Sequence, residues 1–375
     1  MTSVSDQLVQ AIELQNCGQL AEATTLFQEI LATEPSNAAA LYSLAVIYLN
    51  AGKYGEALEL SNRGCYFAPA FAPMRFVQGA ALQAAGRKVE ALQSYDAALA
   101  IKPDFIEVLI NSGAMLRDML QHGAALERFN RVLAIDPNYA PALANCGIIL
   151  TEYKQSEQAI AMFERLLALK PDYEYGLGLL VYERLHAGDW TEFHNLKQAI
   201  AAGVKEGKRV CKTLAFMALS DIGSEHFLCA RIFAHHYCPP PHKALWKGEK
   251  YSHKKIRIAY VSPDLREHPV GHLMAGVFES HDKSKFETIA ISLGIDDQSR
   301  LRGRMLDAFD HFIDARELSA RQIAERLREM EVDIAVDLAG YTSDSRMEIF
   351  AYRPAPIQVG FLGYPGTLGD RKSVV

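Results

Sequence analysis

Two side chains capable of acid–base chemistry, Asp264 and His268, stand four residues apart in the segment IRIAYVSPDLREHPVGHLM, residues 256–274. An imidazole can take a proton from a hydroxyl group near neutral pH, so His268 is the candidate general base. Asp264 could act as the base itself or orient the histidine. His272 belongs to the helix expected to follow and is the weaker candidate. Many histidines in loops have no catalytic role, so whether this pair is catalytic depends on the secondary-structure elements that position it.

A strand, a loop and a helix are expected to position the pair. The apolar run that begins at Ile256 predicts a buried strand over residues 256–262. Pro269 suits the first turn of a helix, and the apolar residues after it predict a helix over 269–280. Both candidate residues lie in the intervening loop, which is where an α/β domain faces its ligand.

Strand and helix patterns alternate through the rest of the chain. The predicted strands are 256–262, 286–293, 311–313, 333–338 and 356–362, and the predicted helices are 269–280, 299–309, 318–331 and 344–352. Alternating βαβ units imply a parallel, doubly wound, Rossmann-like sheet that binds ligands at the carboxyl ends of its strands. Neither a G-x-G-x-x-G fingerprint nor a P-loop is present, which argues against a nicotinamide dehydrogenase and a P-loop enzyme.

Further loops at the strand ends carry polar residues or glycines. They are residues 294–296, 337–342 and 363–367. The last of them, Gly363-Tyr364-Pro365-Gly366-Thr367, combines two glycines and a proline, which suits a close approach of backbone to ligand.

The first half of the chain is an internal repeat. Prolines recur every 34 residues, at positions 35, 69, 103, 137 and 171, and alanines keep the same step at 23, 57, 91, 125 and 159. Small residues recur at 11, 45, 79, 113 and 147, and aromatic residues at 27, 95, 129 and 163, with Ser61 interrupting the aromatic series. This pattern predicts tetratricopeptide repeats over residues 1–175, stacked into an α-solenoid with a concave peptide-binding face.

Asn111 and Asn145 share one repeat position that is expected to face the concave surface. An asparagine amide can donate to and accept from a peptide backbone, so both are candidate peptide-binding residues. They could instead be ordinary polar positions, since Ser43 and Val77 occupy the equivalent places in other repeats.

Residues 176–254 lose the repeat period but keep helical patterning, so we expect a helical cap and linker there. His235, His236, Cys238 and His242 cluster around three prolines and raise the question of zinc. We favour a stiff proline-rich linker, because a structural zinc site needs four well-spaced ligands, and we expect no metal.

Composition places the 375-residue chain among ordinary soluble proteins, with a net charge of −6. Acidic residues outnumber basic ones by 19 to 12 in residues 1–175, which argues against nucleic acid as a partner. The six cysteines form no paired motif, and we see neither a signal peptide nor a membrane-spanning stretch. We therefore expect a cytoplasmic protein.

The segment at 256–274, together with DLAGYTSDSRMEIFAYRPAPIQVGFLGYPGTLG, resembles the O-GlcNAc transferases, particularly their bacterial members. Tetratricopeptide repeats before such a domain are also that family's layout. The resemblance implies an inverting transfer of N-acetylglucosamine from UDP-GlcNAc, the co-substrate, to Ser or Thr of acceptor peptides or proteins, with no cofactor or essential metal. It also implies a B-type fold of two facing Rossmann-like domains.

The same resemblance implies roles for individual residues. His268 matches the family's discussed catalytic base, and Asp264 matches a nearby aspartate also considered for that role. Asn111 and Asn145 match an asparagine ladder that grips acceptor peptides. Backbone positions near the donor sugar lie in the loop of Leu362, Gly363, Tyr364, Pro365, Gly366 and Thr367.

The chain also departs from the family. Glu267-His268-Pro269-Val270 stands where animal enzymes have N-H-P-T, and the chain stops at Val375, after a single Rossmann-like half-domain expected over 255–375. The final residues 370–375 look unlike the family's continuation into a second half-domain, so we expect a truncated protein with impaired transfer. The alternatives are a non-catalytic repeat scaffold that holds peptides and transfer of a different hexose, because the sequence leaves the donor sugar open.

Overall fold

The computed structural model describes residues 3–239, 243–342 and 344–369. The chain divides into two compact units, Met1–Pro171 and Asp172–Val375. Each unit contains hydrophobic core of its own.

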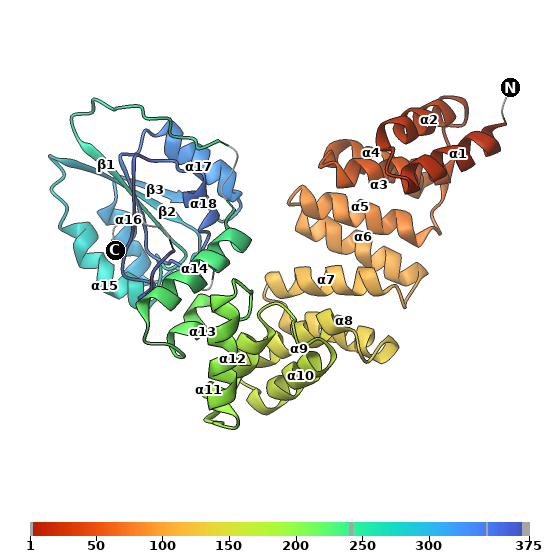
Figure 1. Ribbon diagram of the computed structural model, residues 1–375. Coiled ribbons are helices and arrows are strands. Elements are labelled where there is room, and N and C mark those ends of the chain that lie inside the picture. The colour runs from red at the N-terminus through yellow and green to blue at the C-terminus, as the bar shows by residue number, and fades with distance from the viewer. Residues whose placement is uncertain (1–2, 240–242, 343, 370–375) are drawn as a thin grey trace. The chain divides into compact units, whose positions relative to one another are not determined.

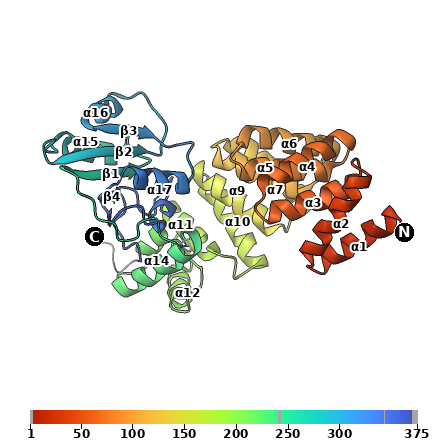
Figure 2. The ribbon, with the colours of Figure 1, turned by 90° about the horizontal axis from the view of Figure 1, so that it is seen from above.

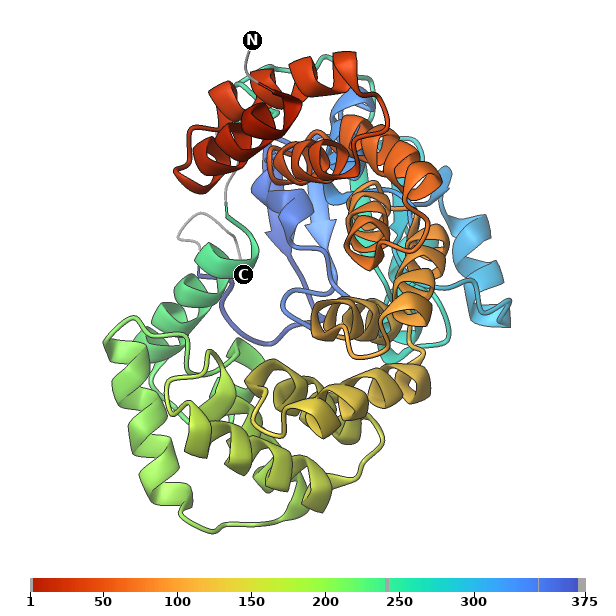
Figure 3. The same cartoon turned by 90° about the vertical axis from the view of Figure 1, so that its right-hand side faces the viewer.

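The described part of the first unit consists of helices joined by short turns (Figure 1). They are α1 Val4–Asn16, α2 Leu20–Thr33, α3 Ala38–Asn50, α4 Tyr54–Phe67, α5 Ala72–Ala84, α6 Lys88–Ile101, α7 Ile106–Asp118, α8 His122–Ile135, α9 Ala140–Glu152 and α10 Ser156–Leu169. Successive helical hairpins follow a curved path within this unit, as Figure 3 shows. The predicted α-solenoid of tetratricopeptide repeats is therefore confirmed.

The small residues of the repeats make room for aromatic rings. A Cβ atom added at Gly79 would lie 2.6 Å from the Tyr95 ring, and one at Gly147 would lie 2.4 Å from Phe163. Where Ser61 interrupts the aromatic series, the facing small residue is Ala45, which is fully buried. Glycine thus accompanies an aromatic ring at Gly79, Gly113 and Gly147, whereas in the first repeat the buried Ala11 holds the small position and Phe27 the aromatic one.

The second unit begins with helices α11 Gly176–Ala187, α12 Phe193–Lys205, α13 Thr213–Met217 and α14 Gly223–Tyr237. Their core includes Val181, Ile200 and Phe216. These helices lie in the segment 176–254, for which the sequence predicts a helical cap and linker, and they belong to the same compact unit as the sheet. The ring of Phe233 lies 4.9 Å from that of Tyr341, edge to face, and this aromatic contact left no periodic signal in the sequence.

A five-stranded parallel sheet follows, built from β1 Ile256–Ser262, β2 Phe286–Ser292, β3 His311–Asp314, β4 Ile334–Asp337 and β5 Ile357–Gly360. The strand order is β3-β2-β1-β4-β5, so β1 is central. Ile258 of β1 lies opposite Thr288 on one side and Ile334 on the other. This confirms the predicted doubly wound, Rossmann-like fold.

Helices cover both faces of the sheet (Figure 2): α15 Pro269–Glu279 and α16 Arg300–Ala308 on one face, and α17 Ala320–Glu329 and α18 Glu348–Ala351 on the other. Alternate residues of β1 divide between the two cores. Ile258 and Tyr260 belong to the first, whereas Ala259 and Val261 belong to the second. Both faces of β1 are therefore buried, as expected for a central parallel strand.

The predicted helix over 344–352 is shorter in the structure, where α18 begins at Glu348. Asp344 has φ of 61°, which a right-handed helix cannot accommodate. The Arg346 guanidinium instead ties this segment to the carbonyl oxygens of Leu318 and Arg316, at 2.6 and 2.8 Å. None of the helices in the described ranges is long and apolar enough to span a lipid bilayer.

Candidate active site

His268 caps the first turn of α15. Its backbone is extended, with φ −154° and ψ 151°, and its Nδ1 accepts the N–H of Val270 at 3.2 Å. Pro269 follows at the first helical position, where an N–H is not needed. The imidazole is 36% exposed, so its other face is open to a ligand.

Asp264 lies beside the imidazole and is buried. Its Oδ2 is 3.7 Å from His268 Nδ1, and its Oδ1 is 3.7 Å from Arg266 Nη2. Burial raises the pKa of Asp264, while the charges of His268 and Arg266 oppose that rise and the charge of Asp344 adds to it. A protonated imidazole is therefore a favourable neighbour for this carboxylate.

His268 can act as a base or not, depending on whether its Nδ1 pairs with Val270 N–H or with Asp264. While Nδ1 accepts from Val270, the proton of a neutral ring resides on Nε2, which then cannot act as a base. If Nδ1 carries the proton and donates it to Asp264, Nε2 becomes the free base. Nδ1 and Asp264 Oδ2 are 3.7 Å apart, so they would have to come closer for this hydrogen bond to form. Catalytic contacts of this kind commonly shorten when substrate binds.

Asp337, at the end of β4, is a further buried carboxylate; the sequence placed it in a strand-end loop, 337–342, but assigned it no individual role. Its Oδ1 accepts from Ala339 N at 3.0 Å and its Oδ2 from Gly340 N at 2.7 Å, which fixes the loop after the strand. Burial raises the pKa of Asp337 to about 6, against the effect of both hydrogen bonds. Its place directly after an apolar strand was the signal that could have singled it out.

The predicted donor-binding loop, Leu362–Thr367, meets the end of β4. A Cβ atom at Gly363 would lie 1.8 Å from the carbonyl oxygen of Leu338, so only glycine fits there. Leu362 has φ of 68°, a left-handed conformation that is costly for a branched side chain. Leu362 and Pro365 are exposed, so part of this loop is accessible to a ligand.

Other side chains of that loop serve its own structure. The Tyr364 ring packs edge to face on Tyr341 at 5.6 Å, its hydroxyl pairs with Thr213, and burial raises its pKa. The ring also lies against Gly366, where a Cβ would be 2.8 Å from it. Thr367 Oγ1 accepts from Gly369 N at 3.1 Å. Backbone atoms and the exposed residues are therefore what this loop can offer a ligand.

Asn111 and Asn145 lie in the first unit, and both amides already have partners. Asn111 hydrogen-bonds the Tyr95 hydroxyl, which itself donates to Gln83 at 2.8 Å. Asn145 Nδ2 donates to Pro141 O at 2.8 Å, and its Oδ1 accepts from Arg117. These two contacts use one N–H of Nδ2 and one lone pair of Oδ1, so the amide retains a second donor and a second acceptor position for a peptide backbone.

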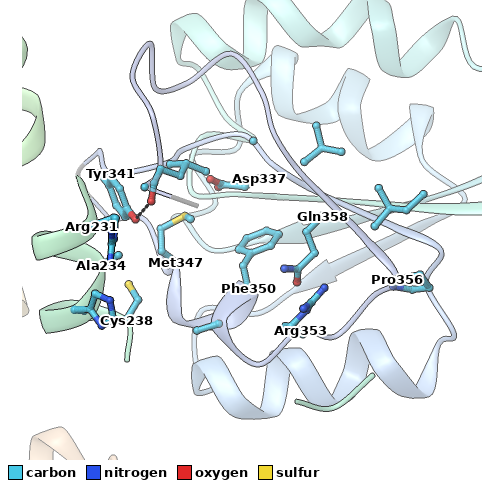
Figure 4. A pocket seen from close by; sticks show the side chains of 17 residues that line it. Arg231, Ala234, Cys238, Asp337, Tyr341, Met347, Phe350, Arg353, Pro356 and Gln358 are labelled. Carbon is cyan, nitrogen blue, oxygen red and sulfur yellow. Dashed lines mark hydrogen bonds between the residues drawn. The ribbon is translucent and has the colours of Figure 1, made fainter. Parts of the chain in front are cut away.

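A cavity of about 690 Å³ lies beside the edge strand β5 (Figure 4). Arg231 of α14 and Cys238, just after that helix, line it from one side, and Arg353 and Gln358 from the other. Of the residues discussed above, it includes Asp337 but neither Asp264 nor His268. We place the candidate chemistry at the β1–α15 loop, because that loop holds the acid–base pair.

The cluster of histidines and Cys238 does not gather around one point in the described residues. His236 Nδ1 pairs with the Tyr175 hydroxyl at 2.9 Å, while Cys238 lines the cavity. His242 and two of the prolines, Pro240 and Pro241, lie outside the described residues, as do 370–375. Within the described ranges, no three His, Cys, Asp or Glu side chains are arranged to hold a metal ion.

Residues 227–372 match the family described as Glycosyl transferase family 41, and residues 18–64 and 116–180 match Tetratricopeptide repeat. Over 116 residues the chain is 40% identical to a probable UDP-N-acetylglucosamine–peptide N-acetylglucosaminyltransferase of Arabidopsis thaliana. Over 117 residues it is 38% identical to the UDP-N-acetylglucosamine–peptide N-acetylglucosaminyltransferase of Caenorhabditis elegans.

These matches cover part of each protein. Each covers 31% of this chain, but only 12% of the plant protein and 10% of the nematode protein. A solved structure of an O-GlcNAc transferase from Thermobaculum terrenum is 21% identical and aligns with 100% of this chain and 54% of that chain. Its TM-score of 0.36 is too low to carry an argument.

Proposed function

Residues 227–372 match the family described as Glycosyl transferase family 41, and from that match we propose that this chain takes part in protein O-GlcNAc transfer. In this proposal N-acetylglucosamine passes from UDP-GlcNAc to a Ser or Thr hydroxyl of an acceptor peptide. The names of the plant and nematode relatives support this donor and this class of acceptor. The repeat array is the proposed acceptor-binding part, with Asn111 and Asn145 as candidate contacts.

The observation that carries the proposal is the Asp264–His268 pair. A buried carboxylate lies 3.7 Å from an imidazole that is open to solvent, at the carboxyl end of the central strand. Parallel sheets of this kind bind ligands at that end. A general base supported by a carboxylate is what deprotonation of a hydroxyl near neutral pH requires.

The proposed reaction is a single displacement. The acceptor oxygen attacks the anomeric carbon as the bond from that carbon to the diphosphate breaks, so the configuration inverts. In the tautomer that carries its proton on Nδ1, the ring gives up the capping contact with Val270 and Nδ1–H donates to Asp264, so that Nε2 is free to take the hydroxyl proton. Asp264 then stabilises the imidazolium that forms.

The loop of Leu362, Gly363, Tyr364, Pro365, Gly366 and Thr367 is the proposed donor contact on this wall of the site. Its exposed Leu362 and Pro365 and its backbone support that role better than the inward-facing Tyr364 does. The proposal assigns no metal or cofactor, following what the family resemblance of the sequence implies.

The proposal can be tested by following labelled sugar from UDP-GlcNAc into a library of Ser- and Thr-containing peptides. We expect incorporation by the full chain, and a fall of about a hundredfold or more in His268→Asn, because a general base contributes that much. His272→Asn is the matched control, since His272 lies on the same helix, is 59% exposed and pairs with Glu267.

Two outcomes would contradict the proposal. Incorporation that is equally strong in His268→Asn would remove the histidine from the chemistry. Peptide binding by the repeat array with no incorporation by the wild type would instead favour the non-catalytic scaffold.

A further inference from the structure

Arg302, on α16, is the only lysine or arginine that is buried among the residues that the structure describes, with 3% of its surface exposed. Burying a cation costs several kcal/mol unless hydrogen bonds and opposite charge compensate it. An apolar side chain of similar length would fill the same space without that cost. The contacts of the guanidinium group therefore indicate what it contributes.

The guanidinium group connects three segments. Nη1 donates to the carbonyl oxygen of Leu265 at 3.0 Å and to Ser292 Oγ, at the end of β2, at 3.1 Å. Nε lies 3.0 Å from Asp296 Oδ1, and the group stacks over the Phe312 ring at 5.1 Å. Only the planar, multiply donating arginine can hold such a set of partners at once.

Leu265 stands between the two residues of the candidate site. Its side chain is fully buried in the core beneath α15 and α16, and its carbonyl oxygen is the one that Arg302 holds. Packing thus fixes the side chain of Leu265, and Arg302 fixes its carbonyl group. Asp264 is the next residue on one side, and His268 follows three residues later on the other.

The β2–α16 loop braces the β1–α15 loop at two more points. Asp297 Oδ2 accepts the backbone N–H of Glu267 at 2.7 Å. A Cβ atom at Gly294 would lie only 1.9 Å from Pro263 O, so the two loops touch through their backbones. Arg302 provides the charged contact within this brace.

We propose that Arg302 is a positioning residue that holds the β1–α15 loop so that Asp264 and His268 stay within reach of each other. The catalytic meaning of that geometry rests on the proposed function, whereas the bracing itself does not. Arg302 touches neither substrate nor the reacting atoms in this account. It acts through Leu265.

The bracing can be measured by hydrogen exchange of the full chain, read by mass spectrometry. In Arg302→Met we expect about tenfold or faster exchange in residues 263–272, because a buried carbonyl loses its donor there. Residues 286–291, the part of β2 that Arg302 does not contact, should exchange as in the wild type. The control is Arg304→Met, an exposed arginine on the same helix that pairs with Glu279 at 2.8 Å.

Unchanged exchange over 263–272 in a folded Arg302→Met protein would overturn the proposal. If that variant does not fold, Asp296→Asn replaces it, since this exposed residue supplies the charge beside Nε. The same segment should then exchange faster, by a smaller factor, and wild-type exchange there would again overturn the proposal.

A transfer assay separates positioning from general destabilisation. Arg302→Met should lower kcat with little change in KM for UDP-GlcNAc, and Arg302→Lys should restore part of the loss because lysine can still donate to Leu265 O. An equal loss of kcat in Arg302→Met and Arg302→Lys would contradict the positioning role in catalysis. If the wild type transfers no sugar, the proposed function fails, and hydrogen exchange still decides whether Arg302 braces the loop.

Discussion

The backbone N–H of Val270 and the carboxylate of Asp264 compete for one nitrogen of His268, and this competition sets what the residue can do. Val270 N lies 3.2 Å from His268 Nδ1 and holds the ring in place, while Asp264 Oδ2 lies 3.7 Å from the same nitrogen. A histidine used only as a helix cap would not need a buried carboxylate beside it. The pair is therefore better explained as a general base with a supporting carboxylate than as a helix cap alone.

Asp337 gives a prediction about pH. Its pKa in the folded chain is raised to about 6, above the ordinary value of 3.8, so the folded state binds its proton more tightly than the unfolded state does. The resulting stability, at most about 3 kcal/mol, is present below about pH 4 and is lost as the pH rises through 6.

Urea unfolding of the wild type and of Asp337→Asn at pH 4.5 and pH 7.5 checks this prediction. Both tryptophans, Trp190 and Trp246, lie in the second unit, so their fluorescence reports on that unit. The stability of the wild type relative to the variant should fall toward the higher pH. A rise would mean that the two backbone N–H groups outweigh burial.

At the residue scale, the sequence predicts position better than partners. His268 and Asp264 are found in the loop where the strand and helix patterns put them. Tyr364 was expected at the donor but faces Tyr341 and Thr213, because a large ring gains more from burial than from exposure in a loop. The role of Arg302 could not be predicted from the sequence, because its partners Leu265 and Ser292 lie outside its own helix and are brought near it only by the fold.

At the scale of elements, three of the repeat hairpins match a glycine with an aromatic ring. Gly147→Ala should destabilise the repeat unit by about 1–3 kcal/mol, because the new methyl group would overlap Phe163. Gly55→Ala is the control, since nothing lies within 4 Å of a Cβ at that position, and alanine favours helix there.

Circular dichroism during urea unfolding measures the helical transition, and tryptophan fluorescence provides a reference for the second unit. Only Gly147→Ala should shift the helical transition to lower urea, with the fluorescence transition unchanged. Equal behaviour of the two variants would show that the ring has room to move.

The sheet could be predicted because its longer strands, such as β1 and β2, are apolar runs that alternate with helical patterns. The boundaries of β1 agree with the prediction at both ends. The shortened α18 could not be foreseen, because Asp344 takes a left-handed conformation and Arg346 bonds to carbonyl groups of residues 316 and 318. These are tertiary contacts that override a helical pattern.

At the scale of the whole molecule, the chain joins a repeat array to a Rossmann-like domain, and residues 227–372 match Glycosyl transferase family 41. Its matches span 12% and 10% of the plant and nematode relatives. The family resemblance supported the proposed chemistry, whereas periodicity and strand patterns supported the two folds. Contacts such as Phe233 on Tyr341, which unite the middle helices with the sheet, needed the structure.

The central claim, that Asp264 and His268 act as one base, is tested most directly by a double-mutant cycle on the transfer rate. We predict that Asp264→Asn lowers kcat/KM by about tenfold to a hundredfold when His268 is present, because the imidazolium loses its carboxylate. In the His268→Asn background the same change should have almost no effect. An equal loss in both backgrounds would show that the two residues act independently and would contradict the account.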